Sequence, residues 1–118
     1  MIRLDKDLII LNASGEQIPV YIEGDAPTVL PDEYFTVSED STSNAVSADN
    51  KARAHLYEFT LKWYTKDATR LYTGLQEAIE QLISKGYDAE GIGYRNATYQ
   101  NTWYSRMVDV EKIDNLEE

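Results

Sequence analysis

The side chains that could carry out chemistry in this sequence are one histidine and a large number of carboxylates. His55 is the only histidine and there is no cysteine, so we expect neither a catalytic triad nor a metal site built on histidine and cysteine ligands. His55 also stands on the apolar side of an alternating segment, which is typical of a packed or hydrogen-bonded core residue. The sequence therefore predicts no catalytic histidine.

The carboxylates are the other candidates, because hard cations such as Mg²⁺ and Ca²⁺ prefer oxygen ligands. Three close acidic pairs are present: Glu39 with Asp40, Asp88 with Glu90, and Asp109 with Glu111. None has the Asp-x-Asp-x-Asn-Gly spacing of a calcium loop, which favours solvated acids over a metal site. The glycines at 91 and 93 lack the third glycine of a dinucleotide-binding loop and predict a turn. We expect no enzyme activity, no cofactor and no resident metal.

Length and charge narrow the class of protein further. The chain has 118 residues, the size of one ordinary domain, and a net charge of −10 from 21 acidic and 11 basic residues. The basic residues are scattered among acids, whereas binding to DNA phosphates needs clustered lysine and arginine. We therefore expect no specific DNA binding. No apolar run is long enough for a signal peptide or a membrane span, so we expect a soluble, intracellular protein without membrane contact.

The elements that must position these residues are predicted from apolar periodicity. Strands are expected at 18–23, 33–38 and 53–65, and one or two more between 94 and 113. In 53–65 the alternate residues fall on one face: His55, Tyr57, Phe59, Leu61 and Trp63. The sequence predicts an α+β fold, an antiparallel or mixed β-sheet with one long amphipathic helix packed on one face. Residues 1–118 are expected to form a single domain.

The long helix is predicted from about residue 67 to residue 85. Its apolar stripe recurs at steps of three and four residues: Ala68, Leu71, Tyr72, Leu75, Ala78, Ile79, Leu82 and Ile83. Asp67 is the expected N-terminal cap, and Gly86 suits the left-handed residue that ends a helix. Gly74 should cost roughly 1 kcal/mol against alanine, unless it allows close packing on the sheet.

Three segments show no such periodicity. Residues 39–52 are mostly Ser, Asp, Asn, Thr and Ala, and we expect a flexible polar loop there, which at this length is either functional or disordered. Residues 1–11 look short and strand-like rather than helical. The acidic tail at 114–118 is expected to fray.

The aromatic residues exceed what one helix can cover. The core is expected to hold Tyr57, Phe59, Trp63 and Tyr72, while Tyr94, Tyr99, Trp103 and Tyr104 remain. These four are either partly buried in the ordinary way or part of a subunit interface, where tyrosine and tryptophan are enriched. The interface hypothesis joins two of them to the polar loop and names Glu39, Asp40, Asp49, Asn50, Tyr99 and Trp103.

Several stretches resemble one family in their order along the chain. They are residues 31–37 (PDEYFTV), the acidic polar segment ending at 47–50 (SADN), the strand 57–64 (YEFTLKWY), the amphipathic helix, and 98–104 (TYQNTWY). Over residues 18–112 the chain is similar to the tail terminator (tail completion) proteins of long-tailed phages and prophages. It departs from many of them in lacking a clear opening helix.

The resemblance implies a function in virion assembly. Such a subunit would close into a ring, a homohexamer, at the head-proximal end of the tail tube, end tube polymerisation and join the tail to the head connector. Its partners would be copies of itself, the tail tube protein and a connector or head-completion protein, with DNA passing through unbound. It would be part of the virion tail, assembled in the cytoplasm of the bacterial host. Alternatives are another head–tail joining protein, an acidic inhibitor that mimics DNA and, last, a metal-dependent enzyme.

Overall fold

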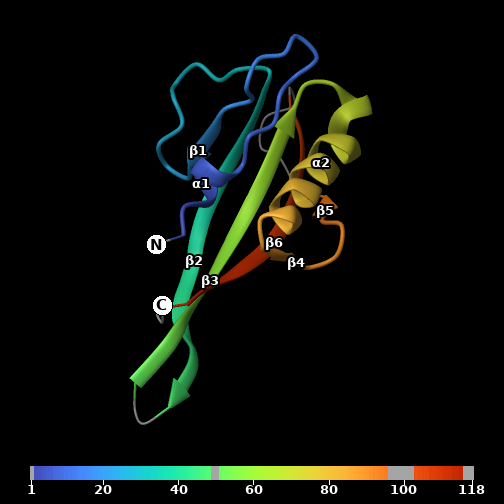
Figure 1. The fold of residues 1–118 in the computed structure, drawn as a ribbon. Coiled ribbons are helices and arrows are strands. Elements are labelled where there is room, and N and C mark those ends of the chain that lie inside the picture. The colour runs from blue at the N-terminus through green and yellow to red at the C-terminus, as the bar shows by residue number, and fades with distance from the viewer. Residues whose placement is uncertain (1, 49–50, 96–102, 116–118) are drawn as a thin grey trace.

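The computed structural model describes residues 2–48, 51–95 and 103–115. Six strands form one sheet in the order β1-β2-β3-β6-β4, and β5 also pairs with β6. The strands are β1 (Val20–Ile22), β2 (Glu33–Ala48), β3 (Lys51–Thr65), β4 (Asp88–Ala89), β5 (Tyr94–Arg95) and β6 (Tyr104–Asn115). Only β1 runs parallel to its neighbour, β2. The predicted α+β class is confirmed, with a mixed sheet and the helix α2 (Leu71–Ser84) on one face (Figure 1).

The alternation along β3 separates the two faces of the sheet as predicted. Tyr57, Phe59, Leu61 and Trp63 are buried towards α2, while the even-numbered residues from Leu56 to Tyr64 are half-buried or exposed. Burial of such large side chains stabilises the domain by roughly 1.5 to 3 kcal/mol each. The remaining core residues on the α2 side are Leu4, Leu8, Ile10, Ile18, Phe35, Val37, Leu75, Ala78, Ile79, Leu82, Tyr87, Val108 and Val110.

The predicted helix is present, preceded by one 3₁₀ turn, η1 (Ala68–Arg70). The Asp67 side chain accepts a hydrogen bond from Thr69 N at 3.0 Å and so caps η1, whereas α2 itself follows Arg70 without a side-chain cap. Gly86 follows the helix with φ of 95°. The apolar stripe was predicted too wide. Tyr72 and Ile83 lie at its margins and are 47% and 54% exposed, because the sheet contacts only one side of the helix.

The predicted polar loop at 39–52 is wrong, because nearly all of it is strand. β2 and β3 remain paired from Glu39 opposite Phe59 to Ala48 opposite Lys51. The side chains there show no apolar period since this part of the hairpin extends past the core, and the backbone ladder rather than apolar burial specifies the strands. We call residues 41–56 the arm; it extends away from α2 (Figure 1).

The arm makes the molecule long. Its principal dimensions are 52 × 26 × 24 Å and its radius of gyration is 15.5 Å, against about 13 to 14 Å for a compact domain of this length. β6 follows β3 into the arm, with Asp114 opposite His55 and Asn115 opposite Ala54. The predicted fraying at 114–118 is therefore wrong for these two residues, which continue β6; residues 116–118 lie outside the described part.

The N-terminal segment packs on the same side of the sheet as α2. It contains one helical turn, α1 (Leu4–Asp7), where a strand-like segment was predicted. The Gln81 side-chain amide binds both the N–H and the C=O of Ile9, at 2.5 and 2.6 Å, as a neighbouring strand would. Tyr87 Oη donates to Asp7 Oδ2 at 2.6 Å. These contacts hold the segment on α2 and on Tyr87, the residue before β4. In the part of the chain that the structure describes, no helix is long and apolar enough to cross a bilayer.

Candidate functional site

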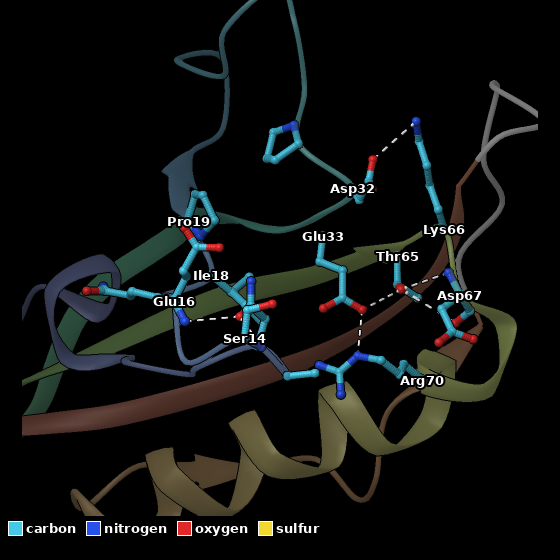
Figure 2. A pocket seen from close by; sticks show the side chains of 14 residues that line it. Ser14, Glu16, Ile18, Pro19, Asp32, Glu33, Thr65, Lys66, Asp67 and Arg70 are labelled. Carbon is cyan, nitrogen blue, oxygen red and sulfur yellow. Dashed lines mark hydrogen bonds and ion pairs between the residues drawn. The ribbon is translucent and has the colours of Figure 1, made fainter.

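A charged hollow lies where the N-terminal segment meets the ends of β2 and β3, and Figure 2 shows it from close by. Its volume is about 600 Å³. Two cationic side chains, Lys66 and Arg70, point into it among four carboxylates. The residues that line it are Asn12, Ala13, Ser14, Glu16, Gln17, Ile18, Pro19, Pro31, Asp32, Glu33, Thr65, Lys66, Asp67 and Arg70.

Both cationic side chains of this hollow are already paired with a carboxylate of the chain. Arg70 Nε donates to Glu33 Oε2 at 2.6 Å, and Thr65 Oγ1 donates to the same oxygen at 2.8 Å. The bond to Glu33 raises the pKa of Arg70 above its ordinary value. Lys66 Nζ lies 3.5 Å from Asp32. Although Thr65 and Glu33 resemble a nucleophile with its base, Thr65 is fully buried, so a substrate cannot reach its hydroxyl. The arrangement links the start of β2 to the end of β3 and to η1.

A second hollow, of about 350 Å³, lies on the face of the sheet away from α2 and is lined mainly by acids. Pairing of the strands places Glu58 directly opposite Glu111, and Glu111 directly opposite Asp88. Carboxylates in such cross-strand positions repel one another. We call this surface the acidic face; its residues are Asp40, Glu58, Asp88, Asp109 and Glu111.

Hydroxyl groups hold parts of the acidic face in place. Thr60 Oγ1 lies 2.5 Å from Asp40 Oδ2 and 3.1 Å from Asp109 Oδ1, and its single hydrogen can serve only one of them at a time. Ser41 Oγ donates to Glu58 Oε1 at 2.8 Å. Within the described residues, no three acidic or histidine side chains are placed to hold one metal ion. The acidic face is therefore a charged surface and lacks the geometry of a cation cage.

An aromatic cluster occupies the other end of the same face. Tyr34 stacks on Tyr64 with ring centroids 4.6 Å apart. The ring centroids of Tyr21 and Trp103 lie 6.0 and 6.2 Å from that of Tyr34. Lys66 Nζ lies 4.6 Å from the centroid of Trp103, and the indole donates to Pro31 O at 3.3 Å. Burial is the main cause that raises the pKa of Tyr34 to about 12. This cluster gives Trp103 partners inside the chain and covers part of Tyr64.

The structure describes three of the six predicted interface residues, Glu39, Asp40 and Trp103, and it does not bring these three together. Glu39 and Asp40 are exposed on β2, and only Asp40 joins the acidic face. Trp103 lies at the opposite end of the sheet, in the aromatic cluster, while Asp49, Asn50 and Tyr99 lie outside the described residues. The interface hypothesis thus stays a prediction.

His55 lies in the arm and is half-buried, so its predicted place in the core is wrong. Its ring centroid is 6.3 Å from that of Tyr57, with the rings near perpendicular. The reason is that the alternation of β3 continues beyond the part of the sheet that α2 covers. His55 thus lies on the same face of β3 as Tyr57, as predicted, but beyond the core.

Sequence reasoning missed the rows of charge on the sheet. Glu58 stands on the polar side of the predicted strand 53–65, and Asp109 and Glu111 alternate with Val108 and Val110. That signal predicts only that they face away from the core. Their contact with one another depends on the register between β3 and β6, which one sequence does not specify.

Comparisons with known proteins identify no relative. No protein-family model, no curated protein and no solved structure matches the chain. The likeness to tail terminators therefore depends on the residues alone.

Proposed function

We propose that this protein is a structural subunit that works by self-assembly into a ring, in the manner of a phage tail terminator. The observation that carries this proposal is the extended sheet, which is uncovered by the described helices on one face and continues into the arm. In the first hollow the hydroxyl that is bonded to a carboxylate, that of Thr65, is buried, and neither hollow has a metal cage among the described residues. Such a molecule offers surface for contact rather than a reaction centre.

The arm supports assembly on energetic grounds. Among the residues that the structure describes, two strands continue beyond Asn115, where Ser47 and Ala48 pair with Ala52 and Lys51. A two-stranded hairpin by itself is marginally stable in water. Contact with a neighbouring subunit would stabilise it by mass action, and a closed ring provides such a neighbour at every position.

The net charge supports a place near DNA without binding to it. A charge of −10 repels a phosphate backbone, and this repulsion is strongest at low salt. A ring whose channel carries acids outside the subunit contacts lets DNA pass without adhering. The partners under this proposal are the tail tube protein on one side and the head connector on the other, in a virion assembled in the bacterial cytoplasm.

The rows of carboxylates also favour a second candidate, an acidic protein that mimics DNA. Glu58, Glu111 and Asp88 follow one another across adjacent strands, which are spaced about 4.8 Å apart. Competition with duplex DNA for a non-specific nuclease separates the two candidates, since a mimic inhibits the nuclease and a ring subunit leaves it active.

The experiment for the leading proposal measures the mass of the assembly by light scattering and native mass spectrometry, over a concentration range, with and without tail-tube protein. We expect a closed oligomer, a hexamer, that caps tubes. A chain that stays monomeric in both conditions contradicts the proposal. A head-completion protein would instead bind the connector and leave tube ends free.

A shortened arm provides the matched variant. Because Ser43 pairs with Leu56, replacing residues 44–55 by Asn-Gly closes the hairpin with a two-residue turn at a paired position. We expect the domain to fold and assembly to weaken. Val29→Ala, in a loop where the side chain is 85% exposed, is the control and should assemble as the wild type does.

A further inference from the structure

The sheet face opposite α2 carries charges that repel one another within a single copy of the chain. Glu58 and Glu111 are directly opposed on β3 and β6, and Asp88 extends the row. Among the described residues, no ion pair involves any of these three carboxylates. Like charges directly opposite each other destabilise a sheet, so a surface of positive charge placed here would relieve the repulsion.

A repulsive pair of the opposite sign lies on the other face of the same sheet. Arg95 on β5 is directly opposite Arg106 on β6. The Arg106 guanidinium lies 5.5 Å from the ring centroid of Tyr72, its Nη2 donates to Gly93 O at 2.8 Å, and its Nε is buried without a partner. Neither arginine forms an ion pair with a described carboxylate. We call Arg95 and Arg106 the arginine pair.

The surroundings of the arginine pair have the composition of a contact surface. Tyr72 and Tyr104 are 47% and 41% exposed, and Tyr104 shares the face of β6 that carries Arg106. Tyrosine and arginine are the types that concentrate binding energy at interfaces, because both combine a large apolar body with hydrogen-bonding groups.

The two charged surfaces cannot neutralise each other inside one molecule. Arg106 and Glu111 are five positions apart on β6, so their side chains point to opposite faces of the sheet. Two copies placed head to tail can bring the acidic face of one against the arginine pair of the other. This heterologous arrangement uses two different surfaces of each copy and generates a ring when the rotation closes.

The spacing of the strand positions that carry the charges fits as well as the sign of the charges. Glu58–Glu111 and Arg95–Arg106 are both directly opposed cross-strand pairs, with Cβ atoms about 4.5 to 5.5 Å apart in each. Two carboxylates can therefore meet two guanidinium groups in register. Arginine binds carboxylates in a planar, two-bond geometry, which gives the contact direction as well as strength.

We infer that the acidic face of one copy docks on the arginine pair of a second copy, with Glu58 and Glu111 facing Arg95 and Arg106. The inference rests on the proposed self-assembly and names its contact surfaces. A second copy is the occupant because it carries two arginines on directly opposed strand positions, as the two glutamates are.

Charge reversal tests this directly in the full chain. Glu58→Lys with Glu111→Lys, or Arg95→Glu with Arg106→Glu, should each raise the dissociation constant of the assembly by at least about tenfold. The fourfold variant, and an equimolar mixture of the two double variants, should restore assembly. The fourfold variant keeps the net charge of −10, since two acids become bases and two bases become acids, so an effect of overall charge is excluded.

Folding is controlled separately, because Arg106 is partly buried. Arg95→Glu alone changes an exposed residue and should weaken assembly while circular dichroism and melting remain as in the wild type. Assembly of the reversed double variants at wild-type strength overturns the inference and leaves the proposed function standing, as does a folded fourfold variant that stays monomeric. A wild-type chain that never self-associates overturns both.

Discussion

The ring of Trp63 occupies the space in which a side chain at Gly74 would begin. A Cβ atom built on Gly74 would lie 2.5 Å from Cε2 and 2.7 Å from Nε1 of the indole. Trp63 is fully buried, and its Nε1 donates to Arg70 O at 3.1 Å, at the start of α2. The sheet and the helix backbone are therefore in direct contact here, and this contact sets how closely α2 approaches the sheet.

Gly74→Ala should destabilise the domain although alanine is the better helix former. The gain in helix propensity is roughly 1 kcal/mol, while forcing a methyl group into a packed core costs about 1 to 3 kcal/mol. Urea unfolding measures the difference. Glu77→Ala, at an exposed position of the same helix, should change stability by less than about 0.5 kcal/mol.

The same substitution in a Trp63→Phe background should cost less, because the smaller ring leaves room for the methyl group. A Gly74→Ala variant more stable than the wild type would show that α2 can move away from the sheet without loss.

The sequence predicted this part of the fold well, and the reason is local. The alternation from Tyr57 to Trp63 and the helical stripe through Leu75 and Ile79 are each read within one element, and Gly74 is a visible exception to that stripe. Prediction failed for Tyr72 because the width of a buried stripe depends on what covers the helix, which is not a local property.

Gln81→Ala should release the N-terminal segment. The Gln81 amide replaces a strand neighbour for Ile9 by binding its N–H and C=O, and each such bond contributes about 1 kcal/mol net. Hydrogen exchange at the Ile9 amide should accelerate, and proteolysis near the N-terminus should become faster. Thr73→Ala, exposed on the same helix, should leave both unchanged. Unaltered protection in Gln81→Ala would mean that buried Leu8 and Ile10 hold the segment alone.

The ion pair between Arg70 and Glu33 should contribute measurably to stability, unlike the neighbouring pair of Lys66 and Asp32. The Arg70 and Glu33 side chains are 25% and 16% exposed, and their charged atoms are 2.6 Å apart. The Lys66 and Asp32 side chains are 43% and 82% exposed, and their charged atoms are 3.5 Å apart. A double-mutant cycle with alanine at Arg70 and Glu33 should give a coupling energy of about 1 to 2 kcal/mol. The same cycle at the exposed pair should give less than about 0.5 kcal/mol. Equal coupling energies for the two pairs would show that burial does not strengthen the ion pair between Arg70 and Glu33.

Ionisation of Tyr34 should lower the free energy of unfolding in alkali. Burial raises its pKa in the folded state to about 12, above the value of about 10 in an unfolded chain. A raised folded pKa means that its contribution is complete below about pH 10 and is lost as the pH approaches about 12. Urea unfolding across this window should show the decline. Tyr34→Phe should make the decline shallower, and the remainder should come from Tyr87, whose pKa burial also raises. Tyr104→Phe, at a 41% exposed residue, should leave the decline as in the wild type.

The acidic face and the arm mark where reasoning from sequence ends. Glu58 and Glu111 are 53 positions apart and meet only through the β3–β6 register. Residues 39–48 form a strand because β3 provides a partner for their backbone, although their polar side chains have neither the composition nor the periodicity of one. Both the acidic face and the arm depend on pairing between strands that are distant in the sequence, and no local sequence pattern predicts that pairing.

The hairpin contains three irregularities of register, between Glu39 and Ser41, between Asn44 and Val46, and between Val46 and Ser47. Each interrupts the regular row of backbone donors and acceptors along the outer edge of β2, where β1 pairs with Phe35, Thr36 and Val37. An irregular strand edge is a poor template for the repeated addition of strands from other molecules. The protein can thus expose a long polar hairpin and still be protected against growth into amyloid-like fibres.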